Sequence, residues 1–227
     1  MARNITVTNL VLAIRERADQ VGSTFVSDAE IIRMISASWG ELYMKVVGAY
    51  PERYLELKTL TADGTSDYAQ DATFLSTVWI AEVVSATGPM RRLRCISAEE
   101  LPLWLLRTGG RAEVYFVTSG SNAILLLPAP PTGQTYRHAY IPVPVDLASG
   151  ATEINGEAAW EQFIVCDVAG KIAQKEESEH RGHFAERDRI GKRIDEEATL
   201  REILEPRRVE GFGDDGYADE ADWRFNR

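Results

Sequence analysis

The residues whose types and spacing could do chemistry lie close together, between Gln174 and Phe184. Glu177 and His180 form an E-x-x-H motif, and His180 and His183 form an H-x-x-H motif. Residues three positions apart lie on one face of a helix, and helical bundles use E-x-x-H in this way to bind a carboxylate-bridged pair of metal ions. One hypothesis is therefore a metal-dependent helical-bundle enzyme built around Glu177, His180 and His183.

The rest of the sequence does not supply what such a metal site needs. A two-metal bundle requires a second E-x-x-H motif, and the third histidine, His138, falls in a predicted strand. Gly182 also weakens the helix that would orient the other two histidines. The sequence contains no Cys/His zinc spacing, no G-x-x-x-x-G-K-[ST] phosphate loop and no G-x-S-x-G elbow. We predict no catalytic residue, no metal and no cofactor, and interpret the segment as a solvated helix face or a polar contact with a neighbouring subunit.

Composition narrows the function classes further. The chain has 227 residues and a formal net charge of −10, from 35 acidic and 25 basic residues. Nucleic-acid binders need a basic surface to neutralise phosphates, so this balance argues against them and favours protein partners. The sequence has no apolar run near the roughly 20 residues of a membrane span and no signal-peptide pattern, so we expect no membrane partner and maturation in the cytoplasm. There Cys95 and Cys166 are expected to stay reduced, and to be buried.

Two amphipathic segments open the chain. In the first, Val7, Val11, Ile14, Ala18 and Val21 recur at helical spacing, and Gly22 is a stop signal. The second begins with the capping-box sequence "SDAE" at 27–30 and ends before Pro51. Its expected apolar stripe comprises Ile32, Ile35, Trp39, Leu42 and Val46. Two such helices joined by a short loop predict an αα-hairpin.

Strand patterns replace helical ones from about residue 53 to 145. "YLELKTL" (54–60) alternates, and "TVWIAEVV" (77–84) is rich in β-branched and aromatic residues. "AEVYFVTSGSNAILLLPAPP" (112–131) predicts a hairpin, and "SAEELPLWLLR" (97–107) a short helix. In "TYRHAYIPVPV" (135–145) the prolines predict an edge strand.

The third part of the chain is helical again. Asn155 is the expected cap of a helix whose apolar stripe comprises Trp160, Phe163, Ile164, Val168 and Ile172. After Lys175 the pattern is strongly charged but has no clear stop before Leu204. An unbroken helix from Glu157 to Leu204 would be about 70 Å long, with Gly182 as the expected kink or break. A helix of that length would reach a neighbouring molecule.

The last segment, residues 205–227, has no periodicity and is acidic and glycine-rich. Such composition does not fold alone, but spaced aromatic side chains can anchor a segment in pockets on a partner. The candidate partner-binding residues are Phe212, Tyr217, Trp223 and Phe225.

Together these patterns predict an α+β fold, with an N-terminal helical hairpin and a long C-terminal helix flanking a central β-rich module. We expect a helical domain from residues 1–52 and 153–204, an inserted β-rich module at 53–152, and an extended acidic and aromatic tail at 205–227.

The order of these parts resembles the head-to-tail adaptor (connector) proteins of tailed bacteriophages. The resemblance lies in layout and local texture over about residues 8–200: the helical hairpin, "DYAQDATFLSTVWIAEVV", "RRLRCISAEELPLW", a proline-rich last strand and "WEQFIVCDVAGKIAQKEESE". It implies a non-enzymatic structural virion protein at the neck, assembled in the host cytoplasm as a homo-oligomeric ring of typically twelve copies. Its implied partners are the portal protein and a tail or nozzle protein, with genome DNA passing through the ring without sequence-specific binding. Phe212, Tyr217, Trp223 and Phe225 would then be the portal-docking candidates.

A second alternative to this function stays open beside the metal enzyme. The β-rich module could bind a ligand or carbohydrate on a helical stalk, as in another structural or adhesive component of a virion.

Overall fold

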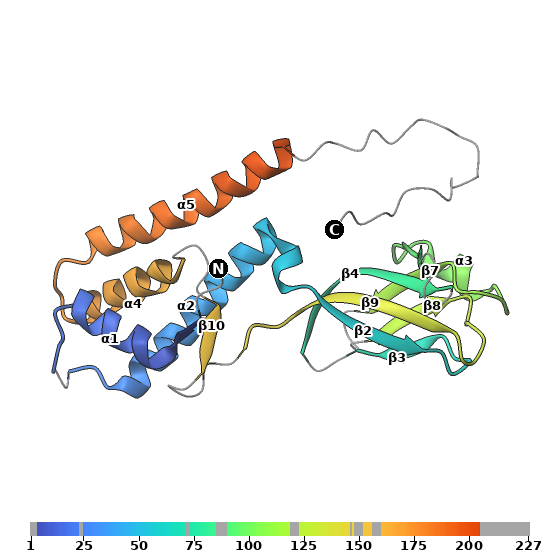
Figure 1. Cartoon of the computed structure of the whole chain (residues 1–227), viewed down its shortest axis with the longest axis horizontal. Coiled ribbons are helices and arrows are strands. Elements are labelled where there is room, and N and C mark those ends of the chain that lie inside the picture. The colour runs from blue at the N-terminus through green and yellow to red at the C-terminus, as the bar shows by residue number, and fades with distance from the viewer. Residues whose placement is uncertain are drawn as a thin grey trace. The chain divides into compact units, whose positions relative to one another are not determined.

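A computed structural model describes residues 4–22, 25–70, 73–84, 90–118, 123–145, 147, 152–155 and 160–204. Contacts divide the chain into two compact units (Figure 1). We call them the helical unit, drawn from Met1–Arg53 and Pro144–Pro206, and the β module, Tyr54–Val143. The combination of helices at both ends with mostly antiparallel sheets between them confirms the predicted α+β class.

The helical unit joins a small two-stranded sheet to a group of helices. Thr6 caps the first helix by accepting a hydrogen bond from the Asn9 amide at 3.3 Å, and Ser27 caps the second by accepting one from the Glu30 amide at 3.3 Å. The elements are β1 (Asn4–Thr6), α1 (Val7–Arg17), α2 (Asp28–Ala49), the 3-10 turn η1 (Pro51–Tyr54), β10 (Glu153–Asn155), α4 (Glu161–Lys175) and α5 (Arg181–Leu204). β1 and β10 pair antiparallel, so one small sheet joins the two chain segments that form the unit. α1 ends at Arg17, so Val21 of the first predicted stripe lies beyond the helix and is exposed.

The buried face of α2 differs from its prediction by one residue. Ile31 is fully buried, whereas Ile32 is partly exposed. Because Ile31 lies one turn before Ile35, it continues the buried stripe, and Ile32 falls about 100° away from it. The rest of the stripe is buried as predicted: Ile35, Trp39, Leu42 and Val46.

The C-terminal helix is present, but it is broken a few residues before Gly182 and does not run on as one extended helix. α4 ends at Lys175, and α5 starts at Arg181 and packs back along α4. Glu177 closes the turn between them in the left-handed region, with φ 57°, so the break comes before Gly182. Folding back buries Ile190 and Ile194, which an extended helix would expose to water. Asn155 is also not the helix cap, because it lies in β10 and α4 begins only after Trp160.

The β module contains two four-stranded sheets, in the orders β2-β9-β4-β5 and β3-β8-β7-β6. Neighbouring strands are antiparallel except β6 and β7. The strands are β2 (Glu56–Thr61), β3 (Asp67–Ala69), β4 (Phe74–Val83), β5 (Met90–Arg92), β6 (Arg94–Cys95), β7 (Val114–Thr118), β8 (Ala123–Leu127) and β9 (Thr135–Pro142). The predicted hairpin is confirmed as β7–β8, and the predicted short helix as α3 (Leu101–Leu105).

The prediction that 135–145 forms an edge strand is wrong, because β9 lies between β2 and β4. The ladder to β2 covers only Thr135–Tyr140 and ends before Pro142. Pro142 pairs only with Phe74 at the start of β4. A proline at the end of a strand costs no hydrogen bond of the central ladder, so its presence does not force the whole strand to an edge.

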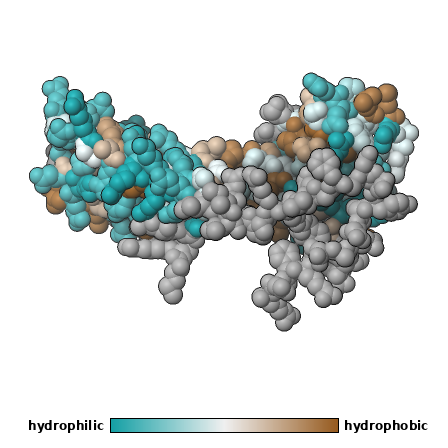
Figure 2. Space-filling view, turned by 90° about the horizontal axis from the view of Figure 1, so that it is seen from above, coloured by the Kyte–Doolittle hydropathy of each residue, from teal (hydrophilic) through white to brown (hydrophobic). Residues whose placement is uncertain are grey.

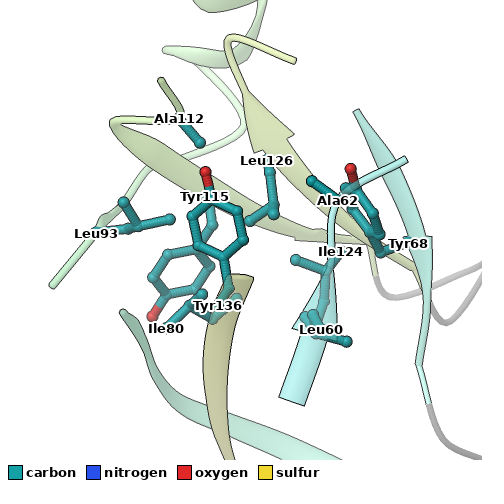
Figure 3. Close-up of a cluster of buried hydrophobic side chains, with 10 residues drawn as sticks. All are labelled: Leu60, Ala62, Tyr68, Ile80, Leu93, Ala112, Tyr115, Ile124, Leu126 and Tyr136. Carbon is teal, nitrogen blue, oxygen red and sulfur yellow. The ribbon is translucent and has the colours of Figure 1, made fainter. Parts of the chain in front are cut away.

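The core of the β module fills the space between its two sheets (Figure 3). Ile80 and Tyr136 come from one sheet and Ile124 and Leu126 from the other, and each is fully buried. α3 covers the outer face of β7 and β8, where Trp104 packs against a second cluster. Of the two cysteines, Cys166 is buried as predicted, but Cys95 is exposed because β6 is a two-residue edge strand.

Candidate interaction surfaces

The Glu177–His183 segment forms the turn into α5, and its histidines contact groups of the same unit. His180 Nδ1 lies 3.0 Å from the Ser178 carbonyl oxygen. His183 Nδ1 accepts a hydrogen bond from Arg17 Nε at 3.5 Å, and burial and the Arg17 charge lower the pKa of His183. A cation beside the ring opposes binding of a metal ion. Within the part of the chain that the structure describes, no three His, Cys, Asp or Glu side chains are grouped as metal ligands.

Charged side chains of α5 pair within the helical unit. Glu186 accepts a hydrogen bond from Arg17 of α1, and Asp195 lies 2.7 Å from Lys45 Nζ of α2. Pairs of this kind on an exposed surface each contribute about 0–1 kcal/mol, so they orient α5 more than they stabilise it. Both of these acidic side chains of α5 are thus paired inside one chain.

One ion-pair cluster in the helical unit is buried. Asp167 of α4 is fully buried; its Oδ1 accepts a hydrogen bond from Arg187 Nη1 of α5 at 2.8 Å, and Lys171 Nζ lies 2.6 Å from its Oδ2. Burial alone would raise the pKa of Asp167, but Lys171 and Arg187 outweigh it and hold the pKa below its usual value. Asp167 therefore joins α4 to α5 as a buried carboxylate.

A second buried carboxylate holds the β module together. Glu82 of β4 is fully buried and accepts hydrogen bonds from Arg91 Nε and Arg111 Nε, both at 2.8 Å. Arg91 also donates to the Ala112 carbonyl oxygen at 2.5 Å. Because Arg91 lies in β5 and Arg111 lies just before β7, the cluster links the two sheets.

His138 is the buried titratable ring of the β module. It is 3% exposed in the central strand β9, stacks on Tyr140 with ring centroids 5.2 Å apart, and places Nε2 3.0 Å from Thr77 Oγ1. Burial, with a smaller contribution from the Lys58 charge, lowers the pKa of His138 to about 4. The folded module therefore holds this ring neutral at pH 7.

The stability of the β module should consequently fall in mild acid. The folded pKa lies below that of the unfolded chain, so the neutral ring's stabilisation is complete above about pH 6.5 and is lost as pH falls toward 4. We expect this one group to account for roughly 2.5 kcal/mol between pH 7.5 and 4.5. Urea unfolding of the full chain at the two pH values measures it. Because glutamine does not titrate, the free energy of unfolding of His138→Gln should fall by about that much less between the two pH values than that of the wild type. An equal fall in both proteins would refute the assignment.

Exposed hydrophobic side chains gather on the β module, whereas the visible face of the helical unit is mostly hydrophilic (Figure 2). On α3 and directly after it, Leu103, Leu105 and Leu106 are 69%, 54% and 81% exposed. Beside them the Arg107 guanidinium stacks on Trp104 at 4.1 Å. We call these three leucines the leucine patch; contiguous exposed apolar groups of this kind mark contact sites for other proteins.

Sequence reasoning predicted the short helix at 97–107 but missed the leucine patch. The available signal was the run "LPLWLL", because a helix of this length has one buried face and cannot bury six consecutive positions, five of them large and apolar. The predicted docking residues Phe212, Tyr217, Trp223 and Phe225 lie outside the described residues, as does the whole segment 205–227. Their role stays a prediction.

The exposed leucine patch on this α+β chain is typical of a protein that contacts other proteins. Among the described helices, none combines the length and apolarity required to cross a membrane. The family model described as SU10 adaptor protein matches residues 5–208, so this chain belongs to that family. The resemblance predicted from the sequence is confirmed, and the chain is a structural adaptor protein of a bacteriophage. No curated protein matches it in the comparison.

Proposed function

We propose that the protein is the head-to-tail adaptor of its virion and forms a closed ring of about twelve copies beneath the portal. The ring extends the DNA channel, sits at the neck and offers the surface to which a tail or nozzle protein attaches. The match of the adaptor family to residues 5–208 carries this proposal, because it covers both units of the chain. Co-sedimentation of the full chain with isolated portal rings tests the proposal, and a full chain that does not co-sediment with them would refute it.

The net negative charge of the chain supports a ring whose channel does not bind the genomic DNA. A net charge of −10 per copy repels DNA phosphates, so DNA would pass through the ring without sequence-specific binding. We propose no catalytic step and no cofactor in this role. Assembly would take place in the host cytoplasm, and the free protein would be a monomer or a weak oligomer until the portal provides a template.

The segment 205–227 is proposed to dock on the portal. Deleting it should abolish co-sedimentation with portal rings, because aromatic anchors supply most of the binding energy of such contacts. Alanine at Trp223 should weaken binding by about 30-fold, equivalent to about 2 kcal/mol. Trp223→Phe is the matched control and should retain most of the affinity. Normal docking of a chain that ends at Leu204 would show that the anchors lie elsewhere.

A further inference from the structure

Charge is distributed unevenly along the β module. From Tyr54 to Met90 the sequence has five acidic residues and one lysine. From Arg91 to Val145 it has six arginines and three glutamates. The second half of the module is therefore positive in a chain whose net charge is −10.

The two halves interleave within the sheets, but their outermost strands lie at opposite edges of the module. β2 and β3 are consecutive in sequence and each ends its sheet on one side, while β5 and β6 end the same two sheets on the other side. Leu93 alone separates β5 from β6, so these two strands share an edge. Figure 1 shows β2 and β3 side by side along one side of the module.

The charged side chains of both edges reach solvent. On the acidic edge, Asp63 and Asp67 are exposed, and hydrogen bonds from the Thr65 hydroxyl and amide lower the pKa of Asp63, which keeps it ionised. On the basic edge, Arg92 is exposed and Arg94 is 59% exposed, with Glu100 3.0 Å away. We call these the acidic edge (Asp63, Asp67) and the basic edge (Arg92, Arg94).

Both edges also offer apolar area. Leu57 of the edge strand β2 is 57% exposed. Beside β6, the basic side has an open groove of about 440 Å³ whose lining includes Leu75, Tyr115 and Val117. The groove is open because β5 pairs only with Ala81–Val83, and among the described residues no strand covers the preceding part of β4 on that side. A partner that docks on either edge could therefore bury apolar area in addition to pairing charges.

We propose that the basic edge of one copy docks on the acidic edge of a second copy of this chain. Two different, complementary edges make a heterologous contact, which closes into a ring when repeated by rotation. The inference rests on the proposed ring and names one surface that forms it. It also explains how chains with a net charge of −10 can lie side by side, because the contact sets opposite charges against each other.

Charge reversal of the full chain tests this contact. Sedimentation velocity at low salt and rising concentration should show weak, salt-sensitive self-association of the wild type. Arg92→Glu with Arg94→Glu, or Asp63→Lys with Asp67→Lys, should weaken it at least tenfold. A mixture of the two variants, or one chain carrying all four substitutions, should recover to within about threefold of wild type, because opposite charges face each other again. Urea midpoints verify that each variant is folded.

A matched control separates location from net charge. Arg33→Glu with Arg189→Glu makes the same change in charge on exposed positions of the helical unit. This control variant should self-associate at least fivefold more tightly than the basic-edge variant. Unchanged association of the edge variants, no recovery in the mixture, or a wild type that stays monomeric throughout would overturn the proposal. A basic edge that binds DNA would also overturn it: the wild type would then bind DNA, and Arg92→Glu with Arg94→Glu would abolish DNA binding but leave self-association unchanged. Portal binding, measured separately, fails or succeeds independently of these outcomes.

Discussion

Replacing Asp167 with alanine is expected to lower the free energy of unfolding of the helical unit by about 3–5 kcal/mol. The carboxylate is fully buried between α4 and α5, and its partners Arg187 and Lys171 are themselves only 27% and 33% exposed. Without it, both partly buried cations lose this carboxylate and Arg187 keeps only the exposed Asp188 of the two, which costs more than the loss of the pair itself. The expected change is a large fraction of the total stability of an ordinary domain.

Asp188→Ala is the matched control for Asp167→Ala. Asp188 also pairs with Arg187, at 2.7 Å, but it is 58% exposed, so its removal should cost less than about 1 kcal/mol. Urea unfolding followed by far-UV circular dichroism reports mainly on the helices and compares the two variants directly. Equal effects of the two substitutions would contradict the view that Asp167 acts as a buried charge.

Replacing Glu82 with alanine should destabilise the β module by about 2–4 kcal/mol. The carboxylate is fully buried, but Arg91 and Arg111 are 40% and 54% exposed and can turn partly toward water when it is removed. The expected loss is for this reason smaller than for Asp167. It should be confined to the module, because every partner of Glu82 described above lies in β5 or next to β7.

Hydrogen exchange of the amides in β4 and β9 measures the effect of Glu82→Ala within the module. Glu113→Ala is the control: this carboxylate is 51% exposed and 3.7 Å from Arg107, so its removal should change the protection by less than about 1 kcal/mol. If Glu82→Ala accelerates amide exchange in α4 as much as in β4, the Glu82 cluster does not act locally.

Local sequence signals predicted the elements that depend on local physics. Thr6 was not singled out as a cap, but the Ser27 cap and the β7–β8 hairpin follow from side-chain chemistry within a few residues. A break near Gly182 was also predicted, but the reversal of α5 onto α4 was not, because its cause is tertiary: Ile190 and Ile194 are buried only when α5 folds back. The position of β9 inside its sheet likewise depends on a distant partner, because its residues pair with β2 residues 74 to 84 positions earlier in the chain.

The interaction surfaces were harder to predict than the fold. Asp167 and Glu82 are ordinary acidic residues in the sequence, and only the packing of α5 and of the two sheets makes them buried. The basic and acidic edges need the strand order, because sequence alone does not tell which strands end a sheet. The charge asymmetry of the β module was present in the sequence, but the total of −10 concealed it.

Electron microscopy of the full chain mixed with isolated portal rings tests the central claim most directly. The adaptor account predicts a continuous ring of about twelve copies attached to one face of the portal, coaxial with its channel. Portal rings that stay bare at saturating protein, or copies scattered over the portal without rotational symmetry, would contradict it.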